Sequence, residues 1–258
     1  MKHLTYTLRG TRSRSVTALL LLASLIALTF AASSALAAQA TVDLGDAATF
    51  GALSTAAMTN APGLDTVVNG DIGSSTSIDV GVTHPGFAAY GAGAIQLANA
   101  QASLLTAYNF AEAQTPTGNI TGVNLAGLTR GPGVYNSTGS ILISGPIALT
   151  LDGGGNADSV FIFQAAAGGD LTVDPLSSVS YTNGAQPCHV FWKVQSAFLK
   201  NTGKTFVGTI LALTQITLTD NITVEGRVLA RNSNVAFIHD TVNVPTCAAA
   251  QDGLTTVS

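Results

Sequence analysis

A short pattern returns along this chain: an apolar residue, any residue, glycine, any residue and another apolar residue. It occurs at 68–72, 206–210 and 224–228, and the last two copies lie 18 residues apart. A repeat of this length built from short β-rich segments is typical of one turn of a β-solenoid. Because a solenoid has flat, regular faces, the pattern directs the search for function to a face rather than to a pocket.

Short apolar segments follow one another from residue 131 onward, separated by Gly, Asn, Asp and Pro. About three of them fall in each 18-residue turn, which predicts an all-β fold of triangular cross-section. The segment at about 92–113 differs, because its apolar residues recur near a 3.6-residue period and predict an amphipathic helix. Its apolar stripe is Ile95, Ala98, Ala102, Leu105, Tyr108 and Ala111, widened by Leu97, Leu104 and Phe110. One such helix cannot bury this stripe alone, so we expect it to pack alongside the solenoid.

The turns also align with one another, at 160–162, 190–192, 208–210 and 226–228. Side chains alternate between the two faces of a strand. The alignment therefore predicts an inward stack of Ile162, Trp192, Ile210 and Val228. Phe161 and Phe191 would then point outward, where the helix could cover them. A looser core register is the alternative.

Residues 1–37 are predicted to be a signal peptide. Four basic residues precede an apolar run at 16–30, and Ala-Leu-Ala at 35–37 is a cleavage signal, so the mature chain would begin near Ala38. A membrane anchor is the alternative, but the run is shorter than the roughly 20 apolar residues that span a bilayer. We expect a secreted protein, extracellular, periplasmic or on the cell surface. Residues 38–247 would form one domain and 248–258 a short disordered tail.

The mature chain is acidic and sparsely charged. Without residues 1–37 it has six basic and fourteen acidic residues, a net charge of −8. Nucleic acids and anionic membrane surfaces attract basic patches, so neither is expected as a partner. We expect a monomer.

The two cysteines, Cys188 and Cys247, are predicted to form a disulfide, as an even pair in an exported protein usually does. Sequential stacking would place them about three turns apart, too far for a direct bridge. Either the tail folds back, or the turns do not stack in chain order. A reactive thiol is the other interpretation, but the chain has no CxxC motif and no basic neighbour beside either cysteine.

The strand that precedes the aligned edge presents small, uncharged side chains. Its apolar residues, expected to point inward, are Val179, Tyr181, Phe206, Ile222, Val224, Val242 and Val244. The outward residues are then Ser178, Ser180, Gly203, Thr205, Asn221, Thr223, Thr241 and Asn243. Lys204 does not fit this alternation.

Such residues predict a regular grid of hydroxyl and amide groups. Neighbouring strands lie ~4.8 Å apart, and the side chain of threonine is stiff at χ1. The grid could hold ordered water and would suit a crystalline partner better than a flexible one. An ordinary exposed strand face is the alternative, because Thr and Asn are common there.

The sequence resembles the secreted microbial ice-binding proteins of the domain of unknown function 3494 type. The matching segments cover nearly all of the mature chain in order, and they are 44–53, 68–73, 131–135, 158–164, 190–194, 206–212 and 226–230. The resemblance implies an irregular right-handed β-helix of triangular section with one long helix alongside. It also implies turns that do not stack in chain order, and adsorption to ice through a flat β-face.

Some members of the family have a loose Thr-Ala/Gly-any-Thr/Asn pattern on that face. The segment from Thr202 to Thr205 fits it, whereas 220–223 keeps only the final threonine and 241–243 fits poorly. Lys204, Asp220 and Glu225 place charges on or near the face, and charged groups prefer liquid water. The resemblance thus implies ice-binding residues among Ser178, Ser180, Thr202, Thr205, Asn221, Thr223, Thr241 and Asn243, with no cofactor.

Two other functions are weighed against ice binding. An adhesin could use the same flat face on a glycan or another repeating surface, and the sequence does not separate the two. An enzyme is less favoured, because the densest acidic residues lie in Gly-rich turns where aspartate is common; they are Asp152, Asp158, Asp170 and Asp174. No spaced calcium-ligand motif and no GxSxG motif is present, and the histidines have no paired spacing for zinc, so we expect neither catalytic residues nor a metal site.

Overall fold

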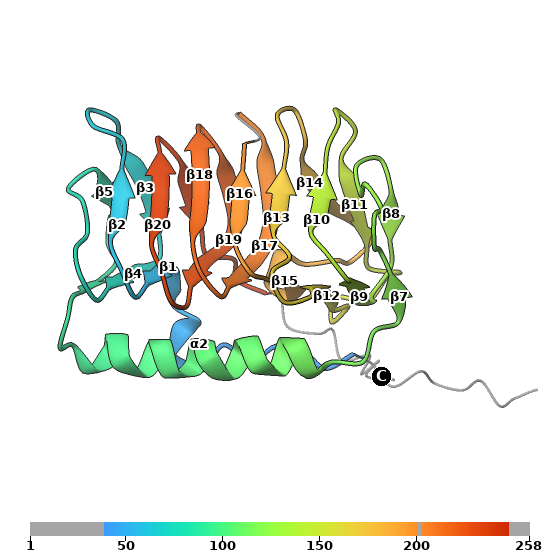
Figure 1. The fold of residues 1–258 in the computed structure, drawn as a ribbon, viewed down its shortest axis with the longest axis horizontal. Helices are drawn as coiled ribbons and strands as arrows, with labels where there is room; N and C mark the ends of the chain where they lie inside the picture. Colours follow the sequence, from blue (N-terminus) through green and yellow to red (C-terminus); the bar gives the residue numbers. More distant parts are fainter. Residues whose placement is uncertain (1–38, 201–202, 248–258) are drawn as a thin grey trace, which may run out of the picture. The chain divides into compact units, whose positions relative to one another are not determined.

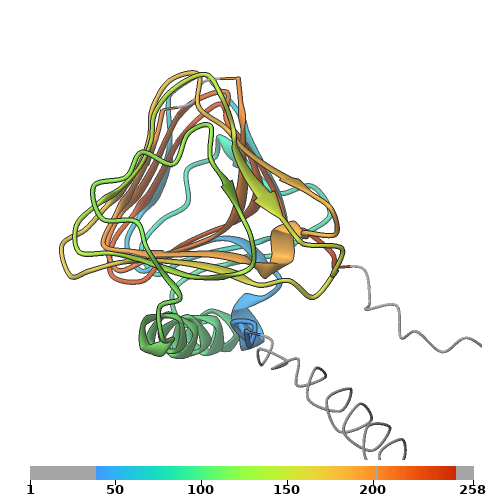
Figure 2. The ribbon, with the colours of Figure 1, turned by 90° about the vertical axis from the view of Figure 1, so that its right-hand side faces the viewer.

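The described chain winds into a parallel β-solenoid with strands on three sides. The computed structural model describes residues 39–200 and 203–247. Figure 2 shows the coils end-on as a triangle, with helix α2 (Ile95–Ala113) beside one side. The predicted solenoid with one long helix is confirmed. The predicted signal peptide at 1–37 and tail at 248–258 lie outside the described residues.

The side beneath α2, called here the helix-covered face, contains the start of the described fold. A short 3-10 helix, η1 (Gly45–Ala47), precedes the first strand of this face. Its strands are β1 (Phe50–Ser54), β4 (Asp71–Ser74), β6 (Ala89–Tyr90), β7 (Gly118–Asn119), β9 (Gly133–Ser137), β12 (Phe161–Ala165), β15 (Val190–Val194) and the second halves of β17 (Thr205–Ala212) and β19 (Thr223–Ala230).

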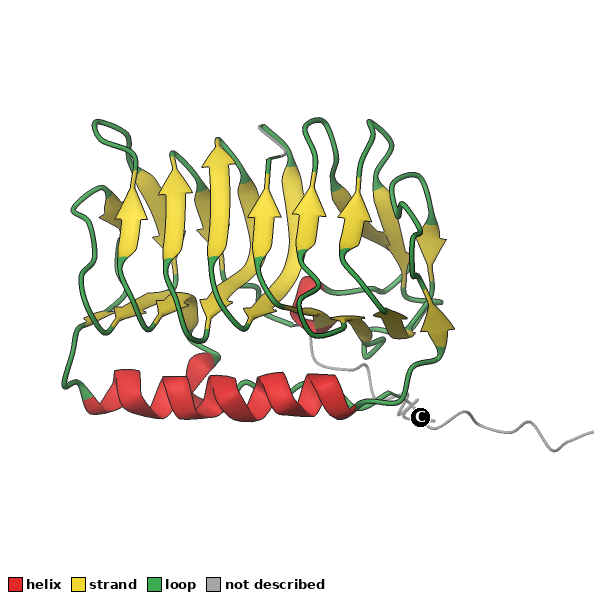
Figure 3. Cartoon of the chain, in the orientation of Figure 1, coloured by secondary structure: helices red, strands yellow, loops and turns green. Residues whose placement is uncertain are grey.

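The other two sides are exposed sheets (Figures 1 and 3). The six-stranded face consists of β10 (Ile141–Ile143), β13 (Leu171–Val173), β16 (Ala197–Leu199), β18 (Ile216–Asp220), β20 (Val235–Ile238) and β2 (Met58–Asn60). The third side, called here the threonine face, consists of β8 (Thr129–Arg130), β11 (Leu149–Asp152), β14 (Val179–Thr182), the first halves of β17 and β19, β21 (Thr241–Asn243), β3 (Thr66–Asn69) and β5 (Val82–Thr83).

The repeated glycine lies at the corner between the threonine face and the helix-covered face. β19 pairs with β21 up to Glu225 and with β1 from Val228, so the strand changes sides around Gly226. A Cβ on Gly226 would lie 1.9 Å from the carbonyl oxygen of Gly208 on the neighbouring coil. Gly208 itself has a φ of +112°, a backbone conformation that residues with a Cβ atom rarely adopt. The pattern therefore marks a bend that has no room for a side chain.

The coils do not stack in chain order. β21 pairs with β3 and β20 pairs with β2, so the first coils of the chain lie beyond the last ones. Figure 1 shows this as blue and cyan strands beside red ones. Helix α2 then runs along the solenoid to its other end, where β7 and β8 begin the remaining coils. The stacking implied by the family resemblance is confirmed.

Aromatic rings from successive coils stack on one another inside the solenoid. Phe163 stacks on Trp192 with ring centroids 4.0 Å apart, and Tyr135 and Phe206 extend the stack at 5.3 Å on either side. The indole nitrogen of Trp192 donates to the carbonyl of Val207 at 2.9 Å. Aromatic pairs in this geometry add about 0.5–1.5 kcal/mol each beyond the area that they bury.

The predicted core register is right for three coils and wrong for one. Trp192, Ile210 and Val228 point inward, and Phe191 packs under the helix, as predicted. Ile162 instead pairs with Phe191 and faces the helix, so Phe161 points inward. Every residue of β12 is buried, and a strand that is apolar on both faces gives no alternation from which to choose its register.

Helix α2 is confirmed, but the predicted face is buried only in part: Tyr108 and Ala111 are buried, and so are Leu97 and Leu104, which were expected to widen that face. Leu97, Ala100, Leu104 and Ala107 face the sheet, whereas Ile95 is 66% exposed and Leu105 is 38% exposed. Apolar and small residues are distributed all around α2, so their periodicity does not select one face of the helix. Ala100 and Ala107 are small and allow a close approach to the strands. Within the described ranges no helix is both long enough and apolar enough to span a membrane.

Candidate functional site

The threonine face has a row of outward hydroxyl side chains along its centre. Strand pairing joins Thr129, Thr150 and Ser180 on one part of the face, and Thr205, Thr223 and Thr241 on the other. Val67 and Thr83 continue the row onto β3 and β5. β14 lies against β17 without a shared ladder, so the row has a seam there. These residues are called here the central row.

The central row is held by a fully buried layer directly beneath it. Phe206, Val224, Val242 and Val68 alternate with the outward residues, and each has no measurable exposure. Strands repeat at ~4.8 Å, and β-branched side chains are stiff. The hydroxyl of Thr150 lies 3.3 Å from that of Ser180, within hydrogen-bond distance across the two strands. The row is thus ordered without a ligand.

A second row lies at the corner with the helix-covered face, and it is less regular. It consists of Val207, Glu225, Asn243 and Asn69. The amide of Asn69 donates to the side-chain oxygen of Asn243 at 2.7 Å. The charge of Glu225 therefore stands at the edge of the face and outside the central row.

Tyr181 and the segment that follows β21 also border this edge. Tyr181 was predicted to point inward but is 43% exposed; it lies one residue before the end of β14, where the chain enters a turn. Partial burial raises the pKa of its phenol, and the nearby Glu225 raises it further. A hollow beside them is also lined by Asn243 and by 245–246. Residues 244–247, which follow β21, are called the tail from here on, in distinction from the predicted disordered tail at 248–258.

The structure brings most of the predicted face residues together. Ser180, Thr205, Thr223 and Thr241 belong to the central row, and Asn243 belongs to the second row. Ser178 immediately precedes β14. Lys204, the misfit of the alternation, is exposed and precedes β17.

Two further predicted residues are not placed on these strands. Asn221 is wrong as a strand residue: it has a φ of +60° and forms the turn between β18 and β19. Asparagine tolerates this left-handed conformation better than most residues do. Thr202 lies outside the described residues.

Sequence reasoning missed Thr129, Thr150 and Thr83. The alternation Leu149-Thr150-Leu151 signals one outward threonine. Thr129 and Thr83 belong to two-residue strands, which are too short to show alternation. Only the unusual stacking order places β5 on the same face as β21.

The six-stranded face is the other exposed sheet, and its outward row is more varied. Strand pairing aligns Leu142, Thr172, Phe198, Thr217, Ala236 and Thr59. Its ladder is continuous over all six strands, but aromatic, aliphatic and hydroxyl side chains alternate irregularly along it. The threonine face therefore has the more uniform chemistry of the two.

The clustered aspartates behave as turn residues. Asp152 accepts hydrogen bonds from the backbone N–H of Gly154 and the amide of Asn183, at 2.9 and 2.8 Å. These bonds, the one from Gly154 foremost, lower the pKa of its carboxyl. Asp174 and Asp170 flank β13 on the six-stranded face, away from Asp152 on the threonine face. The geometry does not converge these aspartates on one reacting atom.

Cys188 and Cys247 form a disulfide, as predicted. Their Cα atoms are 5.9 Å apart, and Cys188 belongs to the short helix η2 (Pro187–His189). β15, β17, β19 and β21 are successive neighbours, so the tail after β21 runs back across two coils to reach η2. Both alternatives offered by the sequence thus occur: the tail folds back, and elsewhere the coils stack out of chain order.

Comparison with known proteins agrees with this architecture. An ice binding protein from an Antarctic biological consortium has a crystal structure similar to this one, with a TM-score of 0.73 and 31% identity over 81% of this chain and 93% of that one. The ice-binding protein of the Antarctic ascomycete Antarctomyces psychrotrophicus gives a TM-score of 0.72 and 34% identity over 80% of this chain and 100% of its own.

Sequence comparison finds the same kind of relative. An ice-binding protein of Nostoc sp. strain HG1 is 42% identical over 141 residues, which is 54% of this chain and 51% of the relative. An ice-binding protein of Colwellia sp. is 30% identical over 223 residues, 80% of this chain and 84% of the relative. The model of the ice-binding-like family matches residues 52–243, and the chain belongs to that family.

Proposed function

We propose that this protein is a secreted ice-binding protein that adsorbs to ice through the threonine face, without chemistry or cofactor. The central row is the observation on which the proposal rests. Each threonine presents a methyl and a hydroxyl group at a spacing of ~4.8 Å, fixed by the buried layer beneath. Water bound in such a row is ordered before contact with a crystal, so little entropy is lost on adsorption.

The proposed contact residues are Ser180, Thr205, Thr223 and Thr241, with Asn243 at one edge. Thr129, Thr150 and Thr83 extend the same row toward both ends of the solenoid. Ser178, Thr202 and Asn221 are proposed to border it. Lys204 and Glu225 flank the row, so their charges can stay hydrated when the row meets ice.

A substitution at the centre of the row tests the proposal. Thr223 has a threonine neighbour on each side, so Thr223→Tyr should lift the face from a flat lattice. We expect the concentration needed to inhibit ice recrystallisation to rise about tenfold, the effect of losing roughly 1.4 kcal/mol of adsorption free energy. Ice-crystal habit and partition into a slowly growing ice hemisphere provide two further readouts.

Thr217→Tyr is the matched control, because Thr217 is an outward threonine near the middle of the six-stranded face. It should leave activity unchanged, and circular dichroism should show both variants folded. The reverse result, with Thr217→Tyr inactive and Thr223→Tyr active, would assign ice binding to the six-stranded face. Round, unshaped crystals and no partition of the unmodified protein would refute ice binding altogether.

The adhesin alternative gains no support from the comparisons, since the relatives described above are all named for ice binding. Secretion is supported by the Cys188–Cys247 disulfide, because disulfides persist in oxidising compartments outside the cytosol. Amino-terminal sequencing of the protein from culture medium should give a start near Ala38.

A further inference from the structure

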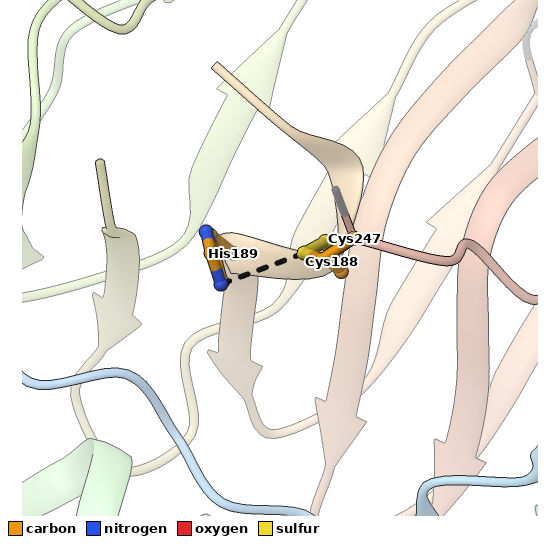
Figure 4. Close-up of side chains that lie close together, drawn as sticks. All are labelled: Cys188, His189 and Cys247. Atoms are coloured by element: carbon orange, nitrogen blue, oxygen red, sulfur yellow. Dashed lines mark hydrogen bonds between the residues drawn. A yellow bond between two sulfur atoms is a disulfide. The ribbon is translucent and has the colours of Figure 1, made fainter. Parts of the chain in front are cut away.

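The disulfide forms a three-residue cluster with the histidine next to it in sequence. Figure 4 shows His189 beside the sulfur atoms of Cys188 and Cys247. The possible ligand atoms of the three residues all lie within 4.8 Å of one another. Cys247 is exposed and the other two are half-buried, so a reductant or an ion can reach them from solvent. In the described part of the chain this is the one group of three or more His, Cys, Asp or Glu residues with such spacing.

The orientation of His189 fixes which nitrogen faces the sulfurs. Nδ1 lies 3.1 Å from the carbonyl oxygen of Ala157, and a carbonyl can only accept, so Nδ1 holds the proton. Nε2 then has a free lone pair and points at Sγ of Cys247, 3.5 Å away. A disulfide sulfur has no proton to donate, so this contact does not satisfy the lone pair. A backbone carbonyl on Nδ1 is also the usual support of a metal-binding imidazole.

We propose that Cys188, Cys247 and His189 form a Zn²⁺ site when the disulfide is reduced. A dithiol reductant transfers two electrons and two protons to the disulfide and is itself oxidised to a disulfide. Each resulting thiol releases its proton to solvent as its thiolate binds the ion, and neutral His189 donates its Nε2 lone pair. Two thiolates and an imidazole are a common set of zinc ligands, and water completes the tetrahedron.

The distances fit a zinc site after one small movement. With Zn–S at about 2.3 Å and Zn–N at about 2.0–2.1 Å, the sulfur and nitrogen ligands of a tetrahedral site lie about 3.5 Å apart. The Nε2–Sγ distance to Cys247 is 3.5 Å. The two sulfurs must separate to about 3.8 Å, and Cys247 can move because it is exposed and lies outside any strand.

Residue spacing does not indicate this site, because Cys247 lies 59 residues from Cys188. The consequence of the proposal is structural. The tail is tied to η2 by a disulfide in the oxidised protein and by the metal in the reduced protein. Either link keeps the tail against the edge of the threonine face.

Cobalt provides a spectroscopic test with the metal alone as probe. The purified full chain is reduced with a dithiol, freed of reductant without oxygen, and titrated with Co²⁺. We expect a thiolate-to-cobalt charge-transfer band and the visible bands of tetrahedral Co²⁺, both lost when Zn²⁺ is added. The oxidised protein should show neither. His189→Ala should bind at least about tenfold more weakly, while His239→Ala, a histidine in a turn on another corner, should match the unmodified protein.

Two results would overturn the proposal. One is a reduced protein that binds Co²⁺ no more tightly than the oxidised protein or Cys188→Ser. The other is His189→Ala with unchanged affinity and spectrum. If reduction alone unfolds the chain, Zn²⁺ should restore the β-sheet circular dichroism of the unmodified protein and fail to restore that of His189→Ala; equal recovery, or none in either, counts against the site.

Discussion

At the residue scale, Asp240 is an acidic side chain in the wall of the solenoid. It is 2% exposed and lies at the corner between β20 and β21. Its two carboxyl oxygens accept the backbone N–H groups of Ile222 and Ile238, each at 2.8 Å. Burial raises its pKa to about 7; the two N–H groups lower it, and the nearby Asp220 raises it again.

This raised pKa predicts a protein that gains stability as the pH falls from 8 to 5. The folded state holds the proton of Asp240 more tightly than the unfolded state, whose carboxyl titrates near 3.9. The stabilisation from the protonated Asp240 carboxyl is fully present below the unfolded pKa and is lost as the pH rises through about 7. The free energy of unfolding should change by up to about 1.4 kcal/mol per pH unit in that interval.

Urea unfolding of the unmodified protein and of Asp240→Asn at several pH values measures the effect. The amide introduced by Asp240→Asn cannot titrate, so the unfolding free energy of this variant should vary less with pH, by this amount. The other ionisable groups are common to both proteins, so their contributions cancel in the difference. Parallel profiles would mean that Asp240 is ionised throughout.

At the scale of the element, the C-terminal end of α2 is closed by a side chain from the sheet. The last carbonyls of a helix lack partners within it. The amide nitrogen of Gln164, on β12, donates to the carbonyls of Ala111 and Gln114 at 2.6 and 3.0 Å. Beside it Lys193, only 3% exposed, pairs with Glu112 at 2.8 Å. The helix is thus fixed to the solenoid by polar contacts at this end and by apolar packing along its length.

Gln164→Met should remove this cap while keeping the volume of the side chain. Buried carbonyls without a donor cost about 1–3 kcal/mol, so the free energy of unfolding should fall by that amount. Gln96→Met, the same change at an exposed position of α2, should cost less than about 0.5 kcal/mol. Chemical denaturation of both variants compares them, and equal losses would show that Gln164 is not an effective cap.

The elements also show how far the sequence determines this fold. The glycine pattern and the alternation in β17, β19 and β21 predict both the corners and the outward threonines, because one side of each strand is polar. β12 is buried on both sides, and the apolar residues of α2 are distributed around the helix, so which of their residues face the helix, the core or solvent depends on packing partners that are distant in sequence. The out-of-order coils and the Cys188–His189–Cys247 cluster depend on such partners as well.

At the scale of the whole molecule, the last strands of the chain pack against its first coils, which are neighbours in space but distant in sequence. β21 joins the carboxy-terminal coils to the amino-terminal ones through β3, so fraying of the tail would loosen both. The disulfide that ties the tail to η2 closes a sequence separation of 59 residues. Closing a loop of this length in the unfolded chain is worth about 4 kcal/mol in the entropic model, and measured values are typically about 2–4 kcal/mol.

The double variant Cys188→Ser with Cys247→Ser should therefore lose about 2–4 kcal/mol of unfolding free energy. It should also keep its ice-recrystallisation inhibition at low temperature, because the central row rests on Phe206, Val224 and Val242 rather than on the tail. Calorimetry and a recrystallisation assay on one preparation measure both. If circular dichroism shows a folded variant that has lost its activity, the edge of the threonine face beside the tail, with Asn243 and Glu225, belongs to the ice-binding surface.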